Sequence, residues 1–361
     1  MSVYQLHPEK NSQRLDPAVG LTLHHELYDL AEGVLKMRAI RALESASANY
    51  PIYRLVRCAA RRRLESVFDD LAMKLGLAAS RLDEGSLLLD GDSVLIQAEG
   101  RRKPGYSSCS FSIWTTTPAR AELLREQILD IVGERYERHQ MFTIDWHFTN
   151  NRGLSSTAFD ELVMDTTYDE AYPTLGKPVS EFIEDYLRAP ATVLILQGPP
   201  GSGKTRLVRA ILSRIAQTRE ETKVMYTGDR KTLESDEIFV DFITGSHAAF
   251  VIEDADHLLL ARSNGNHDLH RFLTIADGVV RSQGRKIIFT TNLPNVSDID
   301  EALLRPGRCF ATVQTRSLTL AECTALANRI SADPSRCAHV LESLMQQGSK
   351  ASVASLYRAL E

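Results

Sequence analysis

The chain has 361 residues, of which 43% are hydrophobic and 25% are charged, and its formal net charge is -5. This is the composition of an ordinary globular protein with two domains, or with one large domain and an appendage. The small net charge excludes a global attraction to nucleic acid or to an anionic membrane. The five cysteines are widely spaced and include no C-x-x-C pair, so they predict neither a zinc site nor a disulfide framework.

The first 20 residues contain no apolar core of a signal peptide, and no apolar run in the chain approaches the ~20 residues that span a bilayer. We therefore expect a cytoplasmic protein that is not inserted into a membrane.

The first 150 residues predict a separate α+β domain. The expected helices cover 21–48, 52–75 and 118–136, and the expected strands cover 87–89, 94–98, 108–116 and 141–148. The polar, glycine-containing segment 149–156 is interpreted as the connection to a second domain.

From residue 151 the pattern changes to short apolar strands that alternate with helical stretches. The expected strands cover 193–197, 223–227, 249–253, 286–291 and 310–314. Such an alternation predicts an α/β core over 151–315, with a five-stranded parallel sheet and helices on both faces. Residues 316–361 contain no strand pattern and predict a small lid of three helices.

A glycine-rich segment directly follows the first of these strands and opens a helix. It fits the phosphate-loop pattern G-x-x-x-x-G-K-[ST], in the strand–loop–helix context that the pattern requires. Backbone N–H groups of such a loop wrap phosphates, the lysine adds a positive charge, and the threonine hydroxyl binds Mg²⁺. The predicted nucleotide-binding residues are Gly198, Pro199, Pro200, Gly201, Ser202, Gly203, Lys204, Thr205 and Arg206.

Two carboxylates follow the third strand. Glu253 and Asp254 lie at its carboxyl end, which is the edge of an α/β sheet where ligands bind. By position, we expect Glu253, together with Thr205, to serve Mg²⁺ and Asp254 to polarise the attacking water.

The fourth strand ends at Asn292, and the segment Arg305-Pro306-Gly307-Arg308 follows. Residues 292–308 resemble the second region of homology of AAA ATPases. In that family the strand-end asparagine is sensor 1, and the two arginines are fingers that reach the nucleotide of the neighbouring subunit. The resemblance gives these catalytic roles to Asn292, Arg305 and Arg308. It also implies a P-loop AAA+ fold with strand order 5-1-4-3-2, the cofactors ATP and Mg²⁺, and a homo-oligomeric ring, as a hexamer.

Within that family, three segments resemble the mitochondrial AAA translocase of the Rieske iron–sulfur protein. They are residues 158–165, 253–256 and 271–279. The apolar pattern predicts no counterpart of the N-terminal transmembrane helix of that translocase, so we do not expect membrane residence.

Two departures from the family pattern limit the functional prediction. Most AAA proteins end the acidic strand with Asp-Glu, whereas here the order is Glu253-Asp254, and the shorter Asp254 predicts slow turnover. The aromatic–hydrophobic–glycine pore loop of threading motors is missing from residues 228–248, where Arg230, Lys231 and Leu233 occur instead.

We therefore expect an ATPase ring that remodels or translocates a protein partner recognised by residues 1–150. One alternative is an assembly switch or scaffold that hydrolyses ATP slowly. Another is a DNA-acting AAA+ protein that uses a basic helix. The arginines of that helix are Arg54, Arg57, Arg61, Arg62 and Arg63. We favour a solvated face balanced by Glu65, Asp69 and Asp70, so nucleic acid is not the favoured partner.

Overall fold

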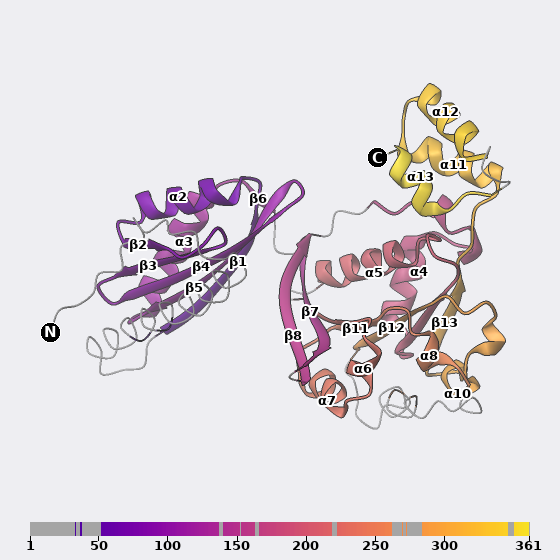
Figure 1. The fold of residues 1–361 in the computed structure, drawn as a ribbon, viewed down its shortest axis with the longest axis horizontal. Helices are drawn as coiled ribbons and strands as arrows, with labels where there is room; N and C mark the ends of the chain where they lie inside the picture. The colour runs from indigo at the N-terminus through magenta and orange to yellow at the C-terminus, as the bar shows by residue number, and fades with distance from the viewer. Residues whose placement is uncertain are drawn as a thin grey trace, which may run out of the picture. The chain divides into compact units, whose positions relative to one another are not determined.

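The computed structural model divides the chain into two compact units, Met1–Tyr136 and Glu137–Glu361 (Figure 1). It describes residues 33, 37 and 52–360, except 137–139, 152, 163–165, 219–221, 262–268, 270–271, 273–283 and 346–349. The helix expected over 21–48 lies outside the described residues apart from Gly33 and Met37. The segment 271–279 also lies outside the described residues, apart from Phe272. Of the segment 158–165, only residues 163–165 lie outside them. Among the described helices, none is long and apolar enough to cross a membrane.

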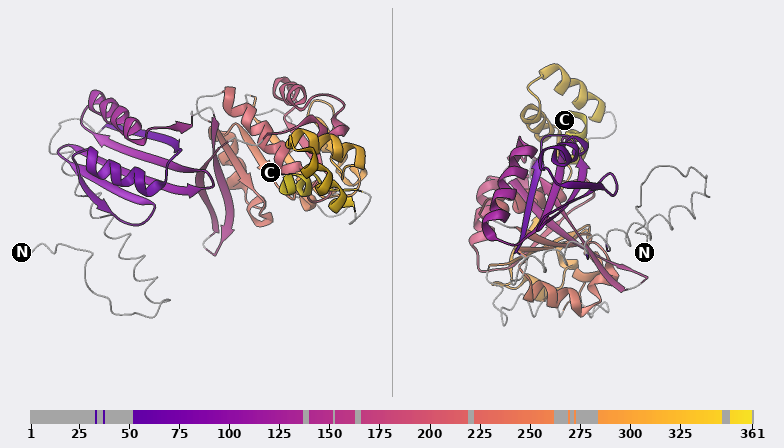
Figure 2. Two further views of the ribbon diagram at one scale, coloured as in Figure 1. Left: turned by 90° about the horizontal axis from the view of Figure 1, so that it is seen from above. Right: turned by 90° about the vertical axis from the view of Figure 1, so that its left-hand side faces the viewer.

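The first unit is an antiparallel sheet with two helices on one face (Figures 1 and 2). The strand order is β2-β3-β4-β5-β1-β6. Its elements are β1 (Ile52–Ala60), α2 (Leu64–Lys74), β2 (Ala78–Arg81), β3 (Ser86–Gly91), β4 (Val94–Lys103), β5 (Tyr106–Thr115), α3 (Pro118–Val132) and β6 (Arg135–Tyr136).

The expected helix over 52–75 is wrong in its first half, because Ile52–Ala60 forms strand β1 and the helix begins only at Leu64. Val56, Cys58 and Ala60 are buried in the core with α2 and α3. These residues alternate with a period of two, which is the spacing of a strand with one face on the core. All nine residues of β1 pair with β5.

The second unit is a seven-stranded sheet with helices on both faces and a helical C-terminal part. Its strands are β7 (Met141–Asn150), β8 (Gly153–Leu162), β9 (Val193–Gln197), β10 (Lys223–Thr227), β11 (Ala249–Ile252), β12 (Lys286–Thr291) and β13 (Cys309–Gln314). Its described α-helices of the core are α4 (Val179–Arg188), α5 (Lys204–Thr218), α6 (Arg230–Leu233), α7 (Asp236–Thr244), α8 (Asp256–Leu259) and α10 (Glu301–Leu304). The last three helices are α11 (Leu320–Ile330), α12 (Pro334–Met345) and α13 (Val353–Leu360).

The strand order is β13-β9-β12-β11-β10-β7-β8. Its first five strands follow the expected order 5-1-4-3-2, and all six strands from β13 to β7 are parallel. Alternate residues of β9 enter two cores: Leu194 and Leu196 pack with α4 and α5, and Val193 and Ile195 pack with α7 and α8. Both faces are covered, which explains why the strand is apolar throughout.

The N-terminal domain expected over 1–150 ends earlier in the structure. Strand β7 pairs in parallel with β10, and the expected connection 149–156 covers the last two residues of β7, the tight turn and the first four residues of β8 in the antiparallel hairpin β7–β8. Gly153 closes this turn with φ of 107°. The side chains of Phe142 and Ile144 pack against the core of the second unit, and this packing assigns the strand to the sheet of that unit.

Candidate nucleotide site

The phosphate loop connects the end of β9 to the start of α5. Gly198, Gly201 and Gly203 have φ values of 153°, 76° and 95°, in the region that favours glycine. A Cβ on Gly198 would lie 2.1 Å from the carbonyl oxygen of Thr315, so no side chain fits there. The first hydrogen bond of the helix runs from Leu207 N to Gly203 O, at 3.0 Å. The N–H groups of the preceding turn therefore have no intrahelical acceptor, which is the arrangement that binds phosphate.

Lys204 lies inside this loop and is only 8% exposed. Its ammonium donates hydrogen bonds to Gly198 O at 2.6 Å, to Pro199 O at 3.1 Å and to Asn292 Oδ1 at 2.9 Å. Burial lowers the pKa of Lys204, and the carboxylates of Asp254, Asp256 and Glu253 act in the opposite direction. The loop thus holds a cation at its centre, where a phosphate group would meet it.

Thr205 and Glu253 are joined at the mouth of the loop. The Thr205 hydroxyl donates to Oε1 of Glu253 at 2.9 Å, and the Tyr226 hydroxyl donates to Oε2 at 2.6 Å. Burial, together with the neighbouring Glu253 carboxylate, raises the pKa of Tyr226. Tyr226 therefore stays neutral and remains a hydrogen-bond donor that fixes the Glu253 side chain.

Asn292 connects Lys204 to the second carboxylate. Its Oδ1 accepts from Lys204, and its Nδ2 donates to Asp254 Oδ1 at 2.9 Å. The backbone N–H of Asn292 donates to Asp256 Oδ1 at 2.8 Å, which fixes the end of β12. Asp254 is exposed and has φ of 49°, a left-handed conformation that aspartate and asparagine adopt more readily than other side chains.

The residues present fit ATP with Mg²⁺. The glycine cradle and the buried Lys204 suit a chain of phosphates. The hydroxyl of Thr205 and the carboxylate of Glu253 are oxygen ligands of the kind that Mg²⁺ prefers, and they lie within hydrogen-bond distance of each other. The structure thus brings together five of the predicted site residues: Lys204, Thr205, Glu253, Asp254 and Asn292. The side chains of the three predicted arginines make other contacts, which are described next.

Arg305 and Arg308 lie in the turn between α10 and β13, away from this chain's own phosphate loop. The backbone O of Arg308 accepts from Val193 N at 3.0 Å, at the amino end of β9. The phosphate loop follows the carboxyl end of the same strand, about 13 Å away along it. The Arg308 guanidinium donates to Ala302 O at 2.8 Å, and Arg305 is exposed.

Arg206 contacts the helical lid. Its guanidinium lies 3.5 Å from the centre of the Tyr357 ring and donates to Thr166 O at 3.2 Å. The lid also reaches the loop directly, because Ala354 N donates to Gly201 O at 2.9 Å. The last helix of the lid therefore lies against the phosphate loop, and Arg206 stabilises that contact rather than pointing at the phosphate position.

The sequence did not reveal three residues that support the site: Tyr226, Tyr172 and Thr315. The Tyr172 hydroxyl donates to Gly203 O at 2.9 Å, and the hydroxyls of Thr315 and Ser202 lie 2.6 Å apart. Each of the three lies near the end of a strand or in a short turn. A single hydroxyl-bearing residue at such a place forms no recognisable sequence motif. For Tyr226, a usable signal is its place near the carboxyl end of the strand that pairs with β11.

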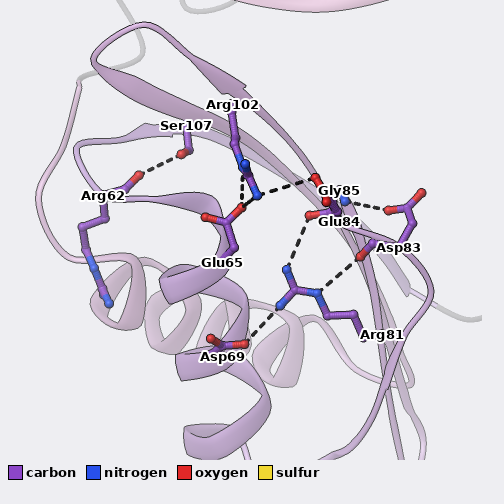
Figure 3. Close-up of polar contacts among 9 residues, drawn as sticks. All are labelled: Arg62, Glu65, Asp69, Arg81, Asp83, Glu84, Gly85, Arg102 and Ser107. Carbon is purple, nitrogen blue, oxygen red and sulfur yellow. Dashed lines mark hydrogen bonds and ion pairs between the residues drawn. The ribbon is translucent and has the colours of Figure 1, made fainter. Parts of the chain in front are cut away.

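The arginines of the first unit do not form one basic helix, because Arg54 and Arg57 are on β1 and the other three connect β1 to α2. Arg62 pairs with Asp70 at 2.8 Å. Figure 3 shows the neighbouring pairs, in which Arg81 lies 3.1 Å from Asp69 and Arg102 bonds Glu65. Asp70 is thus paired with one of the five arginines, whereas Asp69 and Glu65 pair with Arg81 and Arg102, which lie outside that set. The preference for a solvated face over a nucleic-acid interface stays a prediction.

Residues 194–317 match the family model described as "ATPase family associated with various cellular activities (AAA)". The chain is 33% identical over 153 residues to spastin of Drosophila persimilis, a match that covers 37% of this chain and 19% of the relative. Spastin of Drosophila mojavensis is also 33% identical over 153 residues, a match that covers 37% of this chain and 20% of the relative. The chain thus spans about a fifth of the length of these relatives. Together with the site geometry, these matches support the assignment of an AAA+ ATPase module to the second unit.

Proposed function

We propose that this protein hydrolyses ATP with Mg²⁺ and works as a homo-oligomeric ring, as a hexamer, which remodels or translocates a protein bound by its first unit. The observation that carries the proposal is the hydrogen-bonded set of Lys204, Thr205, Glu253, Asp254 and Asn292 at one edge of the sheet. The resemblance to the Rieske-protein translocase supports a protein partner as the substrate.

Each residue of the set has a role in this proposal. Lys204 and the loop N–H groups bind the phosphates, and Thr205 and Glu253 hold Mg²⁺, which neutralises developing charge when it is bound. Asp254 accepts the proton of the attacking water. Asn292 orients that water, because its amide already lies between Lys204 and Asp254.

Arg305 and Arg308 act on the nucleotide of the neighbouring subunit. Their place at the amino end of β9 and the exposure of Arg305 support a role in trans rather than in their own site. An arginine supplied across an interface stabilises charge on the transferred phosphoryl group, and it makes hydrolysis depend on assembly.

Subunit mixing tests the proposal. Lys204→Ala and Arg305→Ala should each lose ATPase activity as pure proteins. Mixed oligomers should regain part of it, because an intact phosphate loop of one subunit then meets an intact Arg305 of the other. No activity in the purified wild-type oligomer, with no change in Lys204→Ala or Asp254→Asn, would contradict the enzyme assignment.

A second candidate is a slow switch that assembles on ATP and rarely hydrolyses it. The short carboxylate of Asp254, already bonded to Asn292, favours this candidate. A single-turnover ATPase measurement beside an ATP-dependent sizing experiment separates the two, since a switch assembles without completing turnover.

A further inference from the structure

The second unit contains a cavity of about 370 Å³ beside the nucleotide site. It lies between α5 and the face of strands β7, β8, β10 and β11. Its volume is within the range of small-molecule sites in proteins, which is about 300–1,000 Å³. Strands β7 and β8 provide one wall, so the cavity depends on the hairpin that extends the sheet beyond β10.

The walls of the cavity are mainly apolar and rich in aromatic side chains. The aromatic residues that line it are Phe142, Trp146, Phe159 and Tyr226, and Val208 and Leu212 approach from α5. Trp146 is 43% exposed, which leaves this wall in contact with solvent. An apolar wall of this kind binds an aromatic body, and the charged side chains that also line the cavity are Glu161, Arg209 and Glu253.

The polar groups at the edge of the cavity are already engaged. Thr205 and Tyr226 both donate to Glu253, and Arg209 donates to Leu162 O at 3.2 Å. Glu161 also has an interaction partner within the protein. A ligand that needs strong hydrogen bonds would have to compete with these contacts, so the lining favours a ligand that binds through apolar contacts.

One wall residue connects the cavity to the catalytic edge. The ring of Tyr226 lines the cavity, and its hydroxyl holds Oε2 of Glu253 at 2.6 Å. The other oxygen of Glu253 holds Thr205. A molecule packed on the Tyr226 ring therefore acts on the pair that is assigned to Mg²⁺.

We propose that this cavity is a regulatory site for a neutral aromatic small molecule, and that its occupancy is transmitted through Tyr226 to Glu253. The regulatory part rests on the proposed ATPase function, whereas binding to the cavity does not. The ligand class follows from the aromatic walls and from the internal pairing of the polar groups.

Binding is tested with N-phenyl-1-naphthylamine, a neutral aromatic probe whose fluorescence rises in apolar surroundings. The full chain should give a saturable signal with about one probe per chain. Val208→Phe places a larger side chain in the cavity and should weaken binding at least tenfold. Ser213→Phe, on the same helix but outside the cavity lining, should leave it unchanged. A signal that is not saturable, or that is equal in both variants, overturns the proposal.

The location is tested independently of these variants. The chain has two tryptophans, and Trp114→Phe leaves Trp146 as the single one. Bound probe should quench Trp146 by energy transfer with the same saturation curve. Unquenched Trp146 at saturation would place the probe elsewhere and overturn the site. A probe signal that appears only on dissociation of oligomers would show that a second copy fills the cavity, and it would overturn the small-molecule site as well.

The regulatory effect is measured as the affinity for ATPγS, a slowly hydrolysed analogue of ATP, by calorimetric titration in the presence of Mg²⁺. A saturating concentration of the probe should change the affinity for ATPγS at least threefold in the wild type. The change should be smaller in Tyr226→Phe, which keeps the aromatic ring but loses the hydrogen bond to Glu253. An equal change in both proteins overturns transmission through Tyr226. If ATPγS does not bind at all, the proposed function is wrong, but the fluorescence experiment still shows whether the cavity binds the probe.

Discussion

The hydroxyl of Thr205 lies 2.9 Å from Oε1 of Glu253, so the start of α5 is bonded to the acidic end of β11. Glutamate is one methylene longer than the aspartate that most AAA proteins have at the corresponding position. The second carboxylate oxygen of Glu253 is held by the hydroxyl of Tyr226. The longer side chain is thus held at both oxygens, which compensates for its greater freedom.

Tyr226→Phe should raise the Mg²⁺ concentration that gives half-maximal ATP hydrolysis by roughly tenfold, because partners that orient a metal ligand typically contribute 10–100-fold. A Mg²⁺ titration of the steady-state ATPase rate measures this. Tyr53→Phe, on an exposed tyrosine of the first unit, is the matched control and should change nothing. An unchanged Mg²⁺ dependence in Tyr226→Phe would exclude the orienting role.

Asp254→Asn should reduce the hydrolysis rate by about 100-fold or more while ATP binding persists, because general-base catalysis contributes roughly 10²–10⁴-fold. Asparagine also adopts the left-handed φ of 49° found at this position, so the fold should be retained. Asp254→Glu should instead destabilise the protein by about 1 kcal/mol, because glutamate carries the steric cost of that conformation. Thermal unfolding and single-turnover hydrolysis measure the two effects, and full activity in Asp254→Asn would reject Asp254 as the base.

Gly198→Ala should abolish nucleotide binding, since the added Cβ would meet backbone and side-chain atoms of Thr315 at 2.1–2.9 Å. The clash moves either the phosphate loop or the segment after β13. Gly228→Ala is the control, because its Cβ would find its nearest neighbour at 3.9 Å. Calorimetric ATP titration of both variants checks the prediction, and wild-type affinity in Gly198→Ala would contradict it.

Lys286 makes stability depend on pH. It is 2% exposed, and burial lowers its pKa from 10.5 to about 8. Its ammonium donates to Ala189 O and Ala191 O at 2.8 and 3.1 Å. Below pH 8 the folded protein carries the full cost of a buried charge. Between about pH 8 and 10.5 only the unfolded chain keeps the proton, so the free energy of unfolding should rise by about 1.4 kcal/mol per pH unit relative to Lys286→Met.

Denaturant unfolding of the wild type and of Lys286→Met at several pH values isolates this contribution, because other titrating groups cancel in the difference. A difference that is constant from pH 7 to 10 would show that Lys286 titrates like an exposed lysine.

The core of the second unit could be predicted because its strands are short, apolar and separated by helices, and because the phosphate loop occupies a fixed place among them. The proximity of Glu253 and Asn292 could be predicted for the same reason, since both lie at strand ends where parallel topology brings them together. The roles predicted for the site residues stay predictions, and those of Arg305 and Arg308 also concern a second copy.

The errors have local causes. Residues 52–60 contain alanine, leucine and arginine, which favour a helix, yet the pairing of all nine residues with β5 decides the conformation. Residues 149–156 look like a linker because they are polar, but Asn150 and Gly153 are paired across a tight turn. In both cases a partner distant in sequence, or a turn conformation, outweighs composition.

The parallel pairing of β7 with β10 has a mechanical consequence. The chain that leaves the first unit at Tyr136 enters the second as β7, so a load carried along the chain between the two units would act on the strand that pairs with β10. Tyr226, which holds Glu253, pairs with Trp146 of that same strand. If the first unit binds a protein as proposed, tension on that protein would reach the strand that pairs with the one carrying Tyr226, whose hydroxyl holds Glu253.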